Sequence, residues 1–184
     1  TAINLAASLA AAQKRTMFID FDPQANATSG VGVDKEEVRR SIYDALIGEA
    51  DIVDIKIDVE PEALGGFLSV VPATPELTGA EVELLHLENR EWRLKQAIEK
   101  ISHEYDFILI DCPPSLSILT VNALTAADSV LIPVQCEYYA MEGLGQLQRT
   151  ISLIRQRLNP DLKVEGYLLT MFDSRNRICH VVAN

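Results

Sequence analysis

The segment YDFILIDCPPS, residues 105–115, is an apolar run that closes on an aspartate followed by two prolines. Such a run predicts a β-strand buried on both faces, which is typical of a parallel sheet covered by helices. The strand is expected to end at Asp111. Pro113 and Pro114 predict a rigid exit, because proline fixes its own backbone angle and donates no ladder hydrogen bond. The segment therefore predicts an α/β fold with a carboxylate at the carboxyl end of a strand.

Apolar runs of similar length occur on both sides of this segment, at residues 15–20, 67–71, 129–134 and 163–171. Amphipathic stretches alternate with them and predict helices at residues 1–14, 41–47, 75–87, 90–102, 116–126 and 139–158. Residues 51–66, acidic and interrupted by a proline and a glycine pair, predict a surface excursion. The alternation predicts a doubly wound, mostly parallel sheet between two layers of helices, in a single domain over residues 1–184.

The composition narrows the function classes. No apolar run approaches the roughly 20 residues that cross a bilayer, and the first residues do not resemble a signal peptide, so we expect a cytoplasmic protein without membrane contact. The 27 acidic and 16 basic residues give a net charge of −11, which disfavours a surface coated with positive charge for nucleic acid. Three widely spaced cysteines, Cys112, Cys136 and Cys179, indicate neither a disulfide framework nor a zinc site.

Two strand exits carry candidate chemistry. Asp20-Phe21-Asp22-Pro23 places two carboxylates two residues apart, and Asp22 could orient a water molecule or accept its proton during phosphoryl transfer. Asp111 closes its strand in the manner of a carboxylate that holds a magnesium ion through water. Acids at strand ends can equally solvate a loop or cap a helix, and the residues alone leave both interpretations open.

Two glycine-bearing segments have less specific signals. Residues 26–32, a small polar loop, could approach phosphate or a partner subunit, or could be an ordinary connection. Gly143 and Gly145 lie inside a helical pattern, where close helix packing is the simplest explanation for them.

Taken together, several segments resemble the ParA/Soj family of chromosome and plasmid partitioning ATPases, within a larger group that includes MinD and nitrogenase iron protein. The matching segments occur in family order and cover nearly the whole chain. They are TAINLA (1–6), FIDFDPQANATSG (18–30), DCPPSL (111–116), PVQCEYYAMEG (133–143) and LTMFDSR (169–175).

The resemblance implies a role for each candidate residue in binding or hydrolysing ATP with Mg²⁺. Asp22 would be the water-positioning residue of the first switch, Asp111 the Walker B residue at the magnesium ion, and Asp20 a supporting group beside them. Pro113 and Pro114 would belong to the second switch. Pro133, Met171 and Asp173 would lie near the adenine or the dimer face.

The sequence also departs from the family pattern. Family members carry a strand and a lysine-glycine-glycine-x-glycine-lysine-threonine loop directly before the position of Thr1, and later helices beyond the position of Asn184. The resemblance therefore implies a P-loop NTPase-like domain without its first strand and its P-loop, which wraps the phosphates with N–H groups. We expect this chain by itself to be inactive.

For the complete protein, the resemblance implies an ATPase that dimerises with ATP, binds DNA without sequence preference, and is stimulated by a ParB-like partner in the bacterial cytoplasm at the nucleoid. The alternatives are a MinD-like, membrane-associated ATPase and an inactive remnant. An electron-transfer role is disfavoured, because Phe21 stands where nitrogenase iron protein has a cysteine.

Overall fold

The structure, a computed structural model, describes residues 1–59, 67–136 and 140–175. The chain divides into two compact units, Thr1–Ala123 and Leu124–Asn184, and each contains its own sheet. The expectation of a single domain over residues 1–184 stays a prediction.

The first unit contains a four-stranded sheet in the order β2-β3-β1-β4. Three of its strands are parallel, and β2 pairs antiparallel with β3 at one edge. The strands are β1 (Thr16–Asp20), β2 (Ile57–Val59), β3 (Leu68–Val71) and β4 (Phe107–Asp111). The helices are α1 (Ala2–Ala11), α2 (Asn26–Gly30), α3 (Ile42–Ile47), α4 (Ile52–Ile55), α5 (Leu77–Glu83) and α6 (Arg93–Glu99), with 3₁₀ turns at Leu84–His86, Arg90–Trp92 and Ser102–Glu104.

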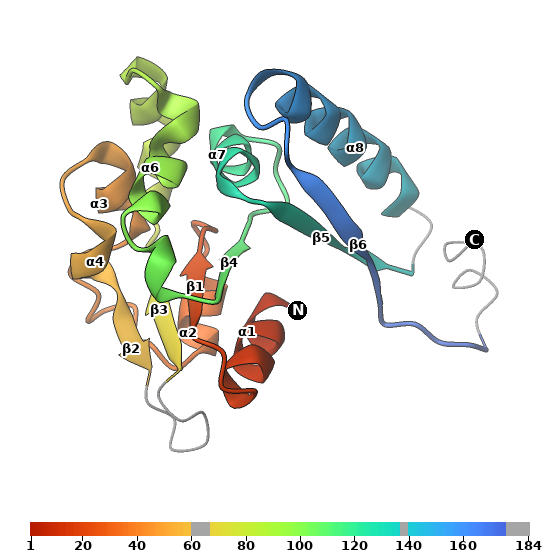
Figure 1. Cartoon of the computed structure of the whole chain (residues 1–184), viewed down its shortest axis with the longest axis horizontal. Helices are drawn as coiled ribbons and strands as arrows, with labels where there is room; N and C mark the ends of the chain where they lie inside the picture. Colours follow the sequence, from red (N-terminus) through yellow and green to blue (C-terminus); the bar gives the residue numbers. More distant parts are fainter. Residues whose placement is uncertain (60–66, 137–139, 176–184) are drawn as a thin grey trace. The chain divides into compact units, whose positions relative to one another are not determined.

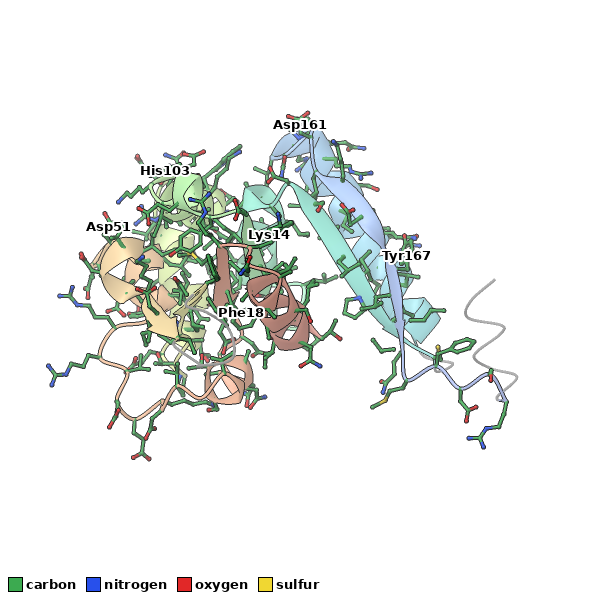
Figure 2. All side chains as sticks on the ribbon, turned by 60° about the horizontal axis from the view of Figure 1, so that its bottom comes forward. Lys14, Phe18, Asp51, His103, Asp161 and Tyr167 are labelled. Atoms are coloured by element: carbon green, nitrogen blue, oxygen red, sulfur yellow. The ribbon has the colours of Figure 1, made fainter. Side chains whose placement is uncertain are left out.

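Helix α1 packs against β1, β3 and β4 and covers one face of this sheet (Figure 1). Its small residues Ala6 and Ala10 belong to the same buried cluster as Phe18, which Figure 2 labels on β1. Met17 and Ile19, which alternate with Phe18 along the strand, are also fully buried, so both faces of β1 are covered. Burial of each large apolar side chain stabilises the fold by roughly 1.5–3 kcal/mol.

The second unit is a parallel β-α-β arrangement. Strand β5 (Ser129–Gln135) pairs with β6 (Lys163–Thr170), and α8 (Ala140–Arg157) connects them along the chain. Helix α7 (Ile118–Ala126) crosses the boundary between the units. Buried Ile132 and Val134 alternate with exposed residues along β5, as expected for a sheet with one face against a helix.

All five predicted strands are present, and the prediction of an α/β fold with a mostly parallel sheet is confirmed. The surface excursion predicted for residues 51–66 is wrong in part, because α4 and the edge strand β2 lie within it; residues 60–66 are outside the described part. Residues 26–30, predicted as loop, form the short helix α2.

Burial of the strands on both faces is confirmed for β1 and β3 only. β4 is partly exposed because it is the last strand in the order of its sheet, and β5 and β6 are partly exposed in a sheet of two strands. Among the described residues, no helix combines the length and apolar character needed to cross a membrane.

Candidate functional site

Three carboxylates gather at the carboxyl ends of β1 and β4. Asp20 and Asp111 are partners in the register of these two parallel strands, and Asp22 follows two residues after Asp20. The backbone N–H of Phe21 donates to the Asp111 carbonyl at 2.9 Å and extends the pairing beyond β1. The structure therefore brings together the three acidic residues singled out from the sequence, at the edge where ligands bind in parallel α/β sheets.

Asp20 is fully buried and its carboxylate is occupied by protein donors. Its Oδ2 accepts from both the N–H and the hydroxyl of Thr28, each at 2.6 Å, and its Oδ1 accepts from the N–H of Asp22 at 3.2 Å. The Thr28 hydroxyl oxygen in turn accepts from the N–H of Ala73, just after β3, at 3.0 Å. Asp20 therefore binds α2 to the end of β1, and through Thr28 also to the segment after β3. These contacts suit a supporting role.

Asp22 is half-buried in a tight turn. Its Oδ1 accepts from the N–H of Gln24 at 2.9 Å, and its carbonyl accepts from the N–H of Ala25 at 2.8 Å. Ala25 has a φ of 50°, in the left-handed region that non-glycine residues disfavour. No hydrogen bond from the described residues reaches Oδ2 of Asp22, so this oxygen can accept one from a water molecule.

Asp111 is half-buried, and its pKa is raised. Loss of hydration on burial is the largest cause, followed by the negative charge of Asp20, with a smaller contribution from Asp22. The neighbouring residue Cys112 is exposed, yet lost hydration around its sulfur and the charges of Asp111 and Asp22 raise the pKa of its thiol to about 12. A bound cation would relieve this repulsion.

The donor set fits a hydrated magnesium ion rather than a cage of protein ligands. Within the described ranges, no three His, Cys, Asp or Glu side chains come together in a way that could hold a metal ion. Mg²⁺ characteristically keeps several waters and uses one or two carboxylates together with substrate phosphates. Asp111 is a partly desolvated carboxylate beside two others, and it is suited to hold such an ion through one of its waters. The metal role of Asp111 stays a prediction.

Pro113 and Pro114 follow β4 and lead toward α7. Pro113 is half-buried and Pro114 is exposed. Ser115 directly follows the two prolines. Its carbonyl accepts a hydrogen bond from the hydroxyl of Thr120 at 2.5 Å, which ties the segment to the first turn of α7. Their assignment to the second switch stays a prediction.

The other predicted site residues belong to the second unit. Pro133 is exposed within β5 and lies opposite Leu168, while Met171 follows β6 and is 81% exposed, with its Sδ 3.0 Å from Nε2 of Gln135. Asp173 accepts from the backbone and guanidinium of Arg175, which lowers the pKa of Asp173. Their approach to adenine or to a dimer face stays a prediction.

Some sequence signals remain open. The quoted residues Glu137, Tyr138, Tyr139 and Cys179 lie outside the described residues. A Cβ atom added at Gly143 or Gly145 would meet nothing within 4 Å, so close packing does not explain these glycines within the described structure.

Thr28 and Lys35 are the site residues that sequence analysis missed. Thr28 lies in the quoted run, but nothing in its spacing from Asp20 indicates the double hydrogen bond between them. Lys35 donates from Nζ to the Gln24 carbonyl at 2.8 Å, and its only sequence signal is being the first basic residue after the acidic exit.

Comparison with known proteins gives the family. A model described as an AAA domain matches residues 1–164. Chromosome partitioning protein ParA of Myxococcus xanthus is 59% identical over 182 residues, covering 99% of this chain and 63% of that protein. Sporulation initiation inhibitor protein Soj of Bacillus subtilis is 53% identical over 178 residues, covering 97% of this chain and 69% of that protein. The chain belongs to the ParA/Soj family.

A solved structure extends the likeness to three dimensions. Cobyrinic acid a,c-diamide synthase from Mycobacterium smegmatis, with a bound ATP analog and magnesium, superimposes with a TM-score of 0.89 at 38% identity, over 99% of this chain and 74% of that one. The relatives named ParA and Soj, at 59% and 53% identity, confirm the resemblance to the ParA/Soj family drawn from the sequence. The chain spans slightly less than two thirds of the Myxococcus ParA.

Proposed function

We propose that the full-length protein is a ParA-like ATPase that binds ATP with Mg²⁺ at the carboxyl ends of β1 and β4. The observation that carries this proposal is the arrangement of the three carboxylates there. Asp20 accepts protein hydrogen bonds at both oxygens, Asp22 keeps one oxygen that no described residue donates to, and Asp111 is partly desolvated beside them. The bound ATP analog and magnesium of the mycobacterial structure support the same ligands.

Hydrolysis requires that water attack the terminal phosphate in line with its leaving group. Oδ2 of Asp22 orients that water, while the bond from the Gln24 N–H holds the carboxylate in place through Oδ1. Asp111 is the residue that would hold a magnesium ion through its water shell, and the ion would supply positive charge to neutralise the phosphates. Asp20 keeps β1, α2 and the β3 end in one arrangement around this water.

The biological role that we propose is chromosome or plasmid partitioning in the cytoplasm at the nucleoid. The protein would dimerise with ATP, bind DNA without sequence preference as the dimer, and be reset by a ParB-like partner. The relatives at 59% and 53% identity, named ParA and Soj, support this role. We give these two relatives more weight than the mycobacterial cobyrinic acid a,c-diamide synthase, because that protein is only 38% identical to this chain.

We also propose that residues 1–184 alone do not hydrolyse ATP. The described site contributes three carboxylates, and carboxylates repel a polyphosphate unless N–H donors and a cation offset the charge. Calorimetry with Mg-ATP and a phosphate-release assay test this: micromolar affinity in this chain would mean that it holds a different phosphate site.

The deciding experiment measures ATP turnover by the full-length protein alone, with duplex DNA, with a ParB-like partner, and with both. We expect slow turnover by the protein alone and stimulation when DNA and partner are both present. No turnover under any of the four conditions would contradict the ATPase proposal, whereas turnover that ignores DNA and partner would contradict only the partitioning role.

A further inference from the structure

We propose that Lys35 is a positioning residue for Asp22: it holds the turn that aims the water-orienting carboxylate. This inference rests on the proposed function, because it concerns the role of Asp22 in hydrolysis. Lys35 lies in the loop between α2 and α3, thirteen positions along the chain from Asp22.

Two short hydrogen bonds connect Lys35 to the Asp22 carboxylate through Gln24. The Lys35 ammonium donates to the Gln24 carbonyl at 2.8 Å, and the Gln24 N–H donates to Oδ1 of Asp22 at 2.9 Å. Because the carbonyl and the N–H flank the same Cα atom, fixing the carbonyl limits the rotation that would turn the N–H away from Asp22. The side chain of Gln24 takes no part in either contact.

The turn needs such support from outside. Ala25, whose peptide group includes the Gln24 carbonyl, has a φ of 50°, a conformation that an L-residue with a Cβ atom adopts at a cost. Strained backbone persists where surrounding contacts determine it. The ammonium of Lys35 supplies a charge-assisted hydrogen bond at this place, and such bonds are stronger than those between neutral groups.

The backbone on either side of Lys35 is held by hydrogen bonds, one of which leads back to the carboxylate cluster. The N–H of Val33 donates to the Thr28 carbonyl at 3.2 Å, and Thr28 is held by Asp20. On the other side of Lys35, the N–H of Glu36 donates to Oδ1 of Asp34 at 3.0 Å and closes a local turn.

These contacts form a closed ring. It runs from Asp20 through Thr28 and the loop to Lys35, then through Gln24 to Asp22, whose N–H returns to Asp20 at 3.2 Å. Asp20 anchors the ring at a buried point, and Lys35 closes it at the surface. Removing the Lys35 ammonium opens the ring next to Asp22 and leaves the buried anchor intact.

The test compares Lys35→Ala and Lys35→Arg in the full-length protein. Misplacing a catalytic group by about 1 Å can cost up to about 100-fold, so we expect Lys35→Ala to lower kcat by roughly 3- to 30-fold. The KM for ATP and the calorimetric ATP affinity should change less than about twofold, because ground-state binding is not removed. Lys35→Arg should keep at least half of the turnover, since a guanidinium can donate to the same carbonyl.

A second readout does not depend on turnover. Hydrogen exchange of the Gln24 amide, followed without nucleotide, should speed up in Lys35→Ala and stay near the wild-type rate in Lys35→Arg. The matched control is Arg39→Ala, which removes one positive charge from an exposed position in the same loop. It should alter neither kcat nor this exchange rate.

The outcomes separate this inference from the proposed function. If Asp22→Ala abolishes turnover while Lys35→Ala retains both wild-type kcat and wild-type exchange at Gln24, Lys35 has no positioning role. An equal loss in Arg39→Ala would also overturn it, in favour of a general effect of loop charge. Wild-type turnover in Asp22→Ala would instead refute the proposed role of Asp22 itself.

Discussion

Asp20 and Asp22 are two residues apart, yet the structure gives their carboxylates different surroundings. Asp20 is fully buried and accepts three hydrogen bonds from the protein. From the part of the chain that the structure describes, Asp22 accepts one, from the turn that follows it. A carboxylate with both oxygens bound to protein donors maintains structure, whereas one with an oxygen available to water can take part in chemistry.

We expect Asp22→Ala in the full-length protein to bind ATP and to dimerise with ATP as the wild type does, while turnover falls by about 100-fold or more. The substitution removes the group that orients water and leaves phosphate binding in place. Steady-state phosphate release and calorimetric ATP binding measure the two properties. Turnover at the wild-type rate would show that another residue positions the water.

Asp111 should make the fold less stable at neutral pH. Its folded pKa is raised above the ordinary value of 3.8, so the folded state holds the proton more tightly than the unfolded state. The stability associated with the proton is present below that value and is lost as the pH rises through the raised pKa. Without magnesium, Asp111→Asn should therefore raise the Tm at pH 7 by about 1–2 °C, a small effect because solvent screens a partly exposed group.

The matched control for Asp111 is Asp106→Asn, which should act in the opposite direction. A hydrogen bond from the Arg15 side chain lowers the pKa of Asp106, so its charged form stabilises the fold above the ordinary pKa. Its neutralisation should lower the Tm at pH 7. Thermal melts of both variants at pH 7 and near pH 3 compare the effects; a lower Tm for Asp111→Asn at pH 7 would contradict the burial argument.

At the scale of elements, the second unit depends on a polar contact between α7 and the turn after α8. Asn159 is buried, and its Nδ2 amide group donates to three carbonyls at the end of α7. These are the carbonyls of Leu124, Thr125 and Ala127, at 3.0, 3.3 and 2.7 Å. Helix ends leave carbonyls without intrahelical partners, so this side chain serves as the C-terminal cap of α7.

Replacing Asn159 by alanine should destabilise the protein by about 1–3 kcal/mol, because buried carbonyls lose a donor that water replaces poorly. Asn159→Asp keeps the side-chain size but loses the donor and should cost at least as much. Asp161→Ala, at an exposed position in the same turn (Figure 2), is the control and should stay within about 0.5 kcal/mol of wild type. Urea unfolding measures all three; equal midpoints for Asn159→Ala and wild type would exclude the cap.

At the scale of the whole molecule, the net charge of −11 opposes contact with DNA. Affinity for DNA without sequence preference comes from lysine and arginine neutralising phosphates, and it falls steeply with salt. We expect residues 1–184 to bind duplex DNA poorly, and the ATP-bound dimer of the full-length protein to bind it without sequence preference.

Fluorescence anisotropy with two unrelated duplexes, at about 50 and 200 mM salt, measures this difference. The full-length protein with ATP should bind both duplexes alike and lose affinity as salt rises. Tight binding of DNA by residues 1–184 without ATP would contradict the prediction.

Much of the fold could be predicted from local sequence. The apolar runs that end at Asp20 and Asp111 predicted β1 and β4, because a buried strand needs consecutive apolar residues and its exit needs polar ones. The short strand β2 could not be predicted in this way. Its three residues are held by pairing with β3, and the period of so short a segment gives no signal.

The sequence by itself determined the family, the five strands that the apolar runs predicted and the two acidic exits, since each of these signals comes from residues close together in the chain. Only the tertiary structure decided that Asp20 pairs in register with Asp111, that the Thr28 hydroxyl donates a hydrogen bond to Asp20, and that Lys35 donates one to the Gln24 carbonyl. Those contacts join residues 8 to 91 positions apart in the sequence, and their partners are chosen by strand register and loop path. Residue type and spacing do not encode register and path locally, so the difference between a supporting and a water-orienting carboxylate emerges only in the folded chain.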